Sequence, residues 1–100
     1  MNNILDKILK INRDIFGDNY NIEKINVGFT NTIYNVDNKY IIKICTNIEN
    51  EENFKREIDF YNHNKNNSLI PKLYYYDITK ENVSYLYEII EKLSFKFFFF

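Results

Sequence analysis

Cysteine is nearly absent from this 100-residue sequence, in which Cys45 is the single example. An internal disulfide and a cysteine zinc cluster are therefore excluded, and the scarcity fits a reducing cytosol. A basic excess is also lacking, because the formal net charge is −1. Binding to nucleic acids or membrane surfaces usually needs such an excess, so we expect neither as a partner.

Long hydrophobic runs are missing as well. No window approaches the roughly 20 apolar residues of a transmembrane helix. Residues 1–7 include an acid and polar residues where a signal peptide needs a cationic and then an apolar run. We therefore expect a cytoplasmic protein. Hydrophobic residues at 45% and aromatic residues at 18% are ample for one folded domain of this length.

The spacing of apolar residues predicts an α+β fold. Ile4, Ile8, Ile11 and Ile15 recur at helical spacing, which predicts a helix over residues 3–16 that Gly17 would end. Shorter patterns and turn residues predict five strands and one further helix. We expect strands at 20–27, 32–36, 40–46, 73–79 and 83–90, and the helix at 50–66, between the third and fourth strands. Short links favour antiparallel pairing, so the strands should form a five-stranded antiparallel sheet.

A lysine and a glutamate stand out because each occupies an apolar setting. Lys43 lies in the strand of residues 40–46, and Glu57 lies on the apolar face of the helix of residues 50–66. A charge that faces a core is costly unless it is paired, so the two could form one ion pair between strand and helix. Phosphoryl-transfer enzymes use such a pair to hold the phosphates of a nucleotide. The alternative is a lysine and a helix-edge glutamate that are both solvated.

Residues around the first turn add weaker signals. Gly28, Thr30 and Asn31 belong to a turn whose glycine would let backbone N–H groups approach a phosphate, although such turns are common in hairpins. Ile33 and Ile41 would cover a purine ring on a nucleotide-binding sheet, or would simply be core residues.

Other conspicuous residues have ordinary explanations. His63 has no second His or Cys nearby, so it is not a metal ligand and should be an exposed helix-end residue. Cys45 has no catalytic partner in sequence and is expected to be structural. No metal-ligating residue is predicted in this chain.

Taken in order, these segments resemble one family. The sequences GFTNTIYNV at 28–36, YIIKI at 40–44, FKRE at 54–57, IPKL at 70–73 and YLYEII at 85–90 carry the resemblance. They resemble the N-terminal lobe of the aminoglycoside phosphotransferase and choline kinase family, which are small-molecule kinases with a protein-kinase-like fold. The resemblance implies domain limits of 1–18 for an N-terminal helix and 19–93 for a kinase-like lobe.

The resemblance also implies roles for single residues. The turn of Gly28, Thr30 and Asn31 would cover the phosphates, and Lys43 would contact the α- and β-phosphates of ATP. Glu57 would be the helix partner of Lys43. The segment from Glu88 to Ile90 would lead into the hinge that meets the adenine edge. The turn departs from the full glycine-rich pattern of protein kinases, which favours the small-molecule branch.

The family's second lobe has no counterpart in this sequence. That lobe carries the catalytic aspartate and the Mg²⁺ ligands, and residues 94–100 are instead an aberrant Phe-rich tail. We expect a truncated or frameshifted lobe that binds a nucleotide, is inactive alone, and meets a small hydroxylated substrate only with a second lobe. The alternatives are a non-catalytic regulatory domain that docks a partner through the exposed hinge face, and a pseudogene product without function.

Overall fold

An antiparallel sheet of five strands forms the centre of the molecule in a computed structural model, which describes residues 2–25 and 31–93. The strand order is β1-β2-β3-β5-β4, and every neighbouring pair is antiparallel. The strands are β1 (Ile22–Ile25), β2 (Asn31–Val36), β3 (Tyr40–Cys45), β4 (Leu73–Asp77) and β5 (Leu86–Glu91). The predicted α+β fold with a five-stranded antiparallel sheet is confirmed. Strand β3 lies at the middle of the sheet, between β2 and β5.

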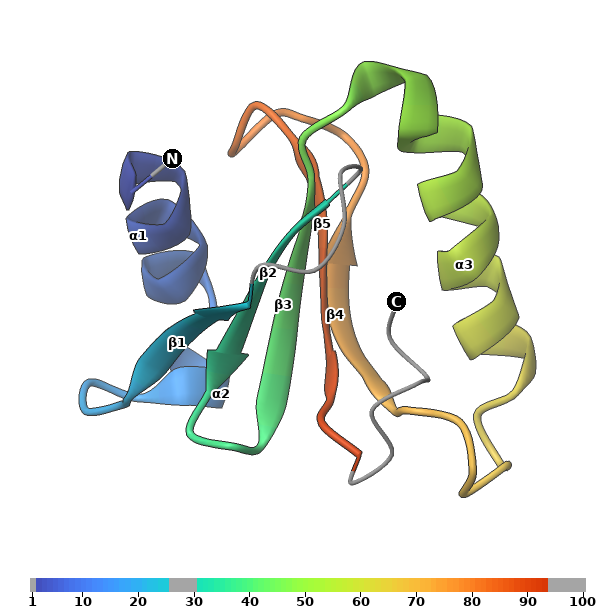
Figure 1. Cartoon of the computed structure of the whole chain (residues 1–100), viewed down its shortest axis with the longest axis horizontal. Coiled ribbons are helices and arrows are strands. Elements are labelled where there is room, and N and C mark those ends of the chain that lie inside the picture. The colour runs from blue at the N-terminus through green and yellow to red at the C-terminus, as the bar shows by residue number, and fades with distance from the viewer. Residues whose placement is uncertain (1, 26–30, 94–100) are drawn as a thin grey trace.

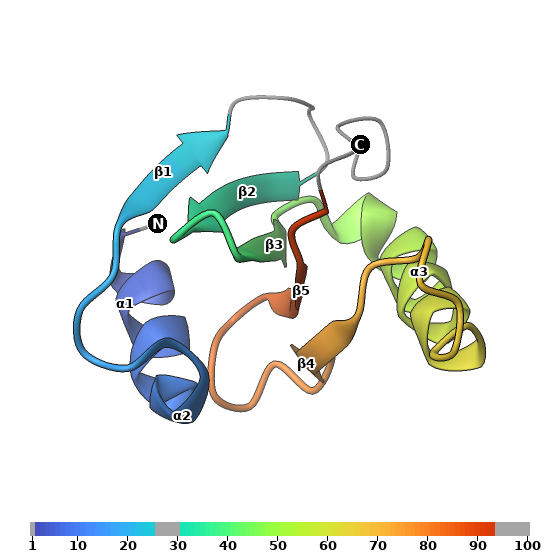
Figure 2. The same ribbon diagram turned by 90° about the horizontal axis from the view of Figure 1, so that it is seen from below.

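Helices cover both faces of the sheet. Helix α1 (Asn2–Ile11) and the short helix α2 (Arg13–Phe16) lie on one face, and helix α3 (Glu51–His63) lies on the other (Figures 1 and 2). A 3₁₀ turn, Ile48–Asn50, leads from β3 into α3. Each face therefore has its own hydrophobic core.

Alternation along the strands divides the buried side chains between these two cores. The core on the α1 side joins residues of α1 to the sheet, among them Leu5, Ile8, Ile42, Ile44 and Ile89. The core on the α3 side consists of two adjoining clusters, whose buried members are Ile33, Ile41, Tyr61 and Ile90 in one, and Cys45, Phe54, Ile58 and Leu86 in the other. A residue of β3 thus faces α1 or α3 according to its place in the alternation.

The N-terminal helix predicted over 3–16 is interrupted at Asn12. The Asn12 side chain is buried, and its Nδ2 donates to the Ile8 carbonyl at 2.9 Å and to the Tyr87 hydroxyl at 3.1 Å. The second bond ties the chain to strand β5 and separates α1 from α2. Ile11, predicted on the apolar face, is 43% exposed, so that part of the prediction is wrong. Gly17 does end α2, with φ of 70° and its N–H bonded to the Arg13 carbonyl.

Several other boundaries differ from the predicted ones. Asn31, expected in a turn, begins β2. Helix α3 ends at His63, three residues early, because the Asn64 side chain donates to the Phe60 carbonyl at the helix end. Strand β5 begins at Leu86 although Val83 is buried. The turn expected at Asp37 and Asn38 is present: both residues have a positive φ, and the Lys39 N–H bonds to the Val36 carbonyl.

Candidate functional site

Strand β3 presents a lysine to helix α3. Ile42 and Ile44 lie in the core on the α1 side, whereas Ile41 and Cys45 lie in the clusters on the α3 side. Lys43 stands between Ile41 and Cys45 in the alternation and is 3% exposed. Its ammonium group is thereby carried into the layer between the sheet and α3.

Helix α3 supplies the counter-charge. Phe54, Ile58 and Tyr61 are buried on the face of α3 that packs on the sheet, and Glu57 lies on the same face. The Lys43 Nζ donates to Oε1 and to Oε2 of Glu57, at 2.7 Å each. The side chains are 4% and 31% exposed, respectively. The predicted contact between the two residues is confirmed, and the alternative of two separately solvated charges is wrong.

A second carboxyl group lies beside this ion pair. Glu88 of β5 is directly opposite Lys43 in the register of β3 and β5. It is 0% exposed, and neither of its carboxyl oxygens accepts a hydrogen bond from the residues that the structure describes. Burial, followed by the nearby negative charge of Glu57, raises the pKa of Glu88 well above its ordinary value.

The isoleucines of the predicted site meet next to these charges. Ile33 of β2 is opposite Lys43, and Ile41 of β3 is opposite Ile90 of β5. All three are buried in one cluster with Tyr61. They are therefore part of the hydrophobic core on the α3 side of the sheet, on the same side as Lys43.

This arrangement of sheet and helices has a counterpart among solved structures. The fold resembles that of an aminoglycoside phosphotransferase. The match is to aminoglycoside phosphotransferase APH(2'')-Ib, in a crystal structure with bound ADP, with a TM-score of 0.62 and 18% sequence identity. It covers 88% of this chain and 28% of that one, so this chain spans less than a third of the length of the phosphotransferase. Neither a protein-family model nor a curated protein sequence matches this chain.

The similarity establishes a kinase-like α+β fold. It bears out the resemblance that the sequence motifs indicated, at the level of fold. The nucleotide-binding roles assigned to Lys43, Glu57 and the isoleucines remain predictions.

The structure describes only some of the remaining residues of the predicted site. Asn31 lies at the start of β2, where its side-chain oxygen accepts a bond of 3.4 Å from Asn50 Nδ2. Gly28 and Thr30 lie outside the described residues. Glu88 and Ile90 lie within β5, which continues to Glu91. Their expected part in a hinge is therefore untested.

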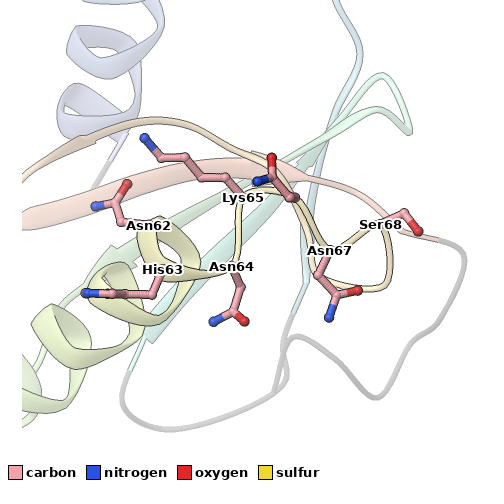
Figure 3. A pocket seen from close by; sticks show the side chains of 7 residues that line it. Asn62, His63, Asn64, Lys65, Asn67 and Ser68 are labelled. Atoms are coloured by element: carbon pink, nitrogen blue, oxygen red, sulfur yellow. The ribbon is translucent and has the colours of Figure 1, made fainter.

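The hollow at the C-terminal end of α3 does not coincide with this site. It is lined by residues 62–68, none of which belongs to the predicted site. The labelled side chains point in different directions and do not converge on a common point (Figure 3). His63 is exposed there, as expected, and its Nδ1 lies 2.7 Å from the Asp59 carbonyl. A binding site usually needs a few convergent polar groups, which this hollow lacks.

The described residues contain neither a metal-binding cluster nor a membrane-spanning helix. Within residues 2–25 and 31–93, no three His, Cys, Asp or Glu side chains are grouped so that they could hold a metal ion. In the same part of the chain, no helix is long and apolar enough to cross a membrane.

Sequence reasoning missed the position of the Glu88 side chain beside Lys43. The alternation of Leu86, Glu88 and Ile90 shows that the three share one face of a strand. That this face meets Lys43 depends on β5 pairing with β3, and no local pattern reveals such a pairing across the intervening helix and strand.

Proposed function

We propose that this chain is the nucleotide-binding lobe of an ATP-dependent small-molecule phosphotransferase, with Lys43 as the phosphate ligand and Glu57 as the residue that positions it. The observation that carries the proposal is the Lys43–Glu57 contact of 2.7 Å between the central strand and the helix that covers it. The kinase-like fold, which matches a phosphotransferase crystallised with ADP, supports it.

The chemistry of the donor set fits a phosphate. A lysine ammonium carries three N–H donors, and the Lys43 Nζ directs its contacts to one carboxylate, that of Glu57. Because these contacts use two of the three N–H groups, one remains for a phosphate oxygen. Lys43 is anchored in the middle strand and held by α3, so little further ordering is needed on binding.

Neighbouring residues would complete the site. Ile33 and Ile41 belong to the apolar cluster on the α3 side of the sheet, against which a purine ring would lie. Gly28, Thr30 and Asn31 would bring backbone N–H groups to the phosphates, and the backbone of residues 88–90 would meet the adenine edge. When bound, ATP would supply the phosphoryl group, and Mg²⁺ would neutralise charge on its phosphates. Transfer to a small hydroxylated acceptor would further require a general base and metal ligands, and the described residues contain no group of three or more His, Cys, Asp or Glu that could hold a metal ion.

Calorimetric titration with ADP and with ATP tests the proposal. We expect the chain to bind both nucleotides and Lys43→Met to bind at least tenfold more weakly, since the phosphate loses its cation. Glu57→Gln should also weaken binding, because the amide holds Lys43 less firmly than a carboxylate does.

Lys55→Met is the matched control. Lys55 lies on α3, its side chain is 41% exposed, and it pairs with the exposed Glu52. It should bind nucleotide like the unaltered chain. Circular dichroism would verify that each variant is folded. Equal affinity in Lys43→Met and the control, or no nucleotide binding by the folded chain, would overturn the proposal and favour a non-catalytic docking domain.

A further inference from the structure

Glu88 is a buried carboxyl group that the proposed phosphate site does not use. Its side chain is fully buried, and its two oxygens lack a donor among the described residues. An ionised carboxylate in such a place would be costly, because it would have neither water nor hydrogen bonds to replace its hydration. The geometry alone therefore argues against a charged Glu88.

Within the part of the chain that the structure describes, the charged and titratable groups around Glu88 come from β3, β4 and α3. Lys43 of β3 directs its contacts to Glu57. Tyr61 of α3 is buried near both carboxyl groups, and burial, with their charges as lesser causes, raises the pKa of its hydroxyl. Tyr76 of β4 lies opposite Glu88 in the register. Of the neighbouring groups, the Glu57 carboxyl raises the pKa of Glu88, through its charge and through hydrogen bonding, and the Lys43 charge lowers that pKa.

Two carboxyl groups can share a hydrogen bond only if one of them carries a proton. With both ionised, two negative charges would face one lysine, and the cluster would hold an unpaired charge in the layer between sheet and helix. With one proton retained, the charges of Lys43 and the remaining carboxylate balance. Glu57 is the carboxylate of the pair, because it faces Lys43 and keeps 31% of its side chain exposed.

We propose that Glu88 is a protonated positioning residue, whose carboxylic acid donates its hydrogen to Glu57 and so fixes the Glu57 carboxylate on Lys43. The cluster of Lys43, Glu57 and Glu88 is then a neutral unit that depends on one proton. When the pH rises, Glu88 releases this proton to solvent and becomes a second carboxylate. Lys43 is then divided between two carboxylates, and the added negative charge repels a phosphate.

The sign of the effect on stability follows from the direction of the pKa shift. The pKa of Glu88 is higher in the folded chain than in the unfolded chain. The stabilisation that this proton provides is therefore complete at pH below the unfolded pKa, falls as the pH rises above it, and is lost once the pH passes the folded pKa. Between the two values, the unfolding equilibrium constant increases about tenfold per pH unit through this one group.

Urea denaturation of the full chain as a function of pH is the first test. Glu88→Gln keeps the shape and can donate an amide N–H to Glu57, but it cannot ionise. We expect the ratio of unfolding constants, unaltered chain over Glu88→Gln, to rise about tenfold per pH unit from about pH 5.5 up to the folded pKa of Glu88. When both proteins also carry Glu57→Gln, the rise in this ratio should end at a lower pH, because the negative charge of Glu57 no longer opposes the ionisation of Glu88. Glu91→Gln, at a partly exposed position of the same strand, is the control, and the corresponding ratio for it should not show this tenfold rise.

If the ratio of the unfolding constants of the unaltered chain and Glu88→Gln does not change with pH, the proposal is overturned. Infrared spectroscopy of the chain labelled with ¹³C-glutamate decides the matter even if a variant does not fold. At neutral pH, we expect an isotope-sensitive band of a protonated, buried carboxylic acid, which disappears on unfolding. If this band is absent, Glu88 is ionised and the proposal fails.

Titrations with ADP at several pH values extend the test, and this part alone rests on the proposed function. We expect affinity to fall as Glu88 ionises in the unaltered chain and to fall less in Glu88→Gln. If no ADP binds but the stability ratio and the infrared band are as expected, the proposed function fails and the protonated role of Glu88 stands. If ADP binds with the same pH dependence in both proteins, Glu88 does not position Lys43.

Discussion

Replacing Lys43 by methionine removes the cation from the layer between β3 and α3 while it keeps a similar volume. Breaking a buried ion pair by removing one partner costs about 3–5 kcal/mol, because the other charge is left without compensation. Here the uncompensated Glu57 side chain is 31% exposed and can recover part of its hydration. We therefore expect Lys43→Met to lower the free energy of unfolding by about 2 kcal/mol, below the range for a fully buried pair.

Urea denaturation at pH 7, followed by circular dichroism, measures this loss. With a slope of about 1 kcal/mol per molar urea for a small domain, the midpoint should fall by about 2 M. The double variant Lys43→Met with Glu57→Met replaces both charges by apolar groups and should regain most of the lost stability, because no unpaired charge remains at Glu57. Lys55→Met, the same substitution on the exposed face of α3, should change the free energy by less than about 0.5 kcal/mol. A Lys43→Met variant as stable as the unaltered chain, or a double variant less stable than Lys43→Met, would refute the reasoning.

Two further predictions concern the core. Asn12→Ala removes the donor that reaches both the Ile8 carbonyl and the buried Tyr87 hydroxyl. We expect thermal unfolding to show that the free energy of unfolding falls by about 1–3 kcal/mol. Tyr87→Phe leaves Asn12 bonded to Ile8 and should lower it by less. Cys45 is 1% exposed, and burial raises the pKa of its thiol. The thiol should therefore be unreactive toward iodoacetamide at pH 8 until urea unfolds the chain. Rapid labelling of the folded chain would contradict this.

The features that the sequence predicted correctly are those set by local periodicity. Lys43 faces α3 because it alternates with Ile42 and Ile44, and Glu57 faces the sheet because it lies at helical spacing from Phe54 and Tyr61. Both inferences need only a period of two or of 3.6 residues. The contact between the two charges then follows from the short connection between strand and helix.

The features that were missed depend on contacts between distant parts of the chain. The break at Asn12 is tied to Tyr87, 75 positions later, and no pattern within residues 3–16 indicates it. The place of Glu88 beside Lys43 requires that β5 insert between β3 and β4, which local periodicity leaves open. The shortened end of α3 depends on an Asn64 side chain that binds the Phe60 carbonyl in preference to continuing the helix.

The central claim is that a nucleotide binds on the α3 side of the sheet, at Lys43. Backbone amide chemical shifts of the ¹⁵N-labelled chain, recorded during titration with ADP, test it most directly. We expect the largest changes to occur at Ile33, Ile41, Lys43 and Glu57. These changes should saturate together, be lost in Lys43→Met and be kept in Lys55→Met. Changes confined to residues 62–68 or to the α1 side of the sheet, or the same changes in Lys43→Met, would contradict it.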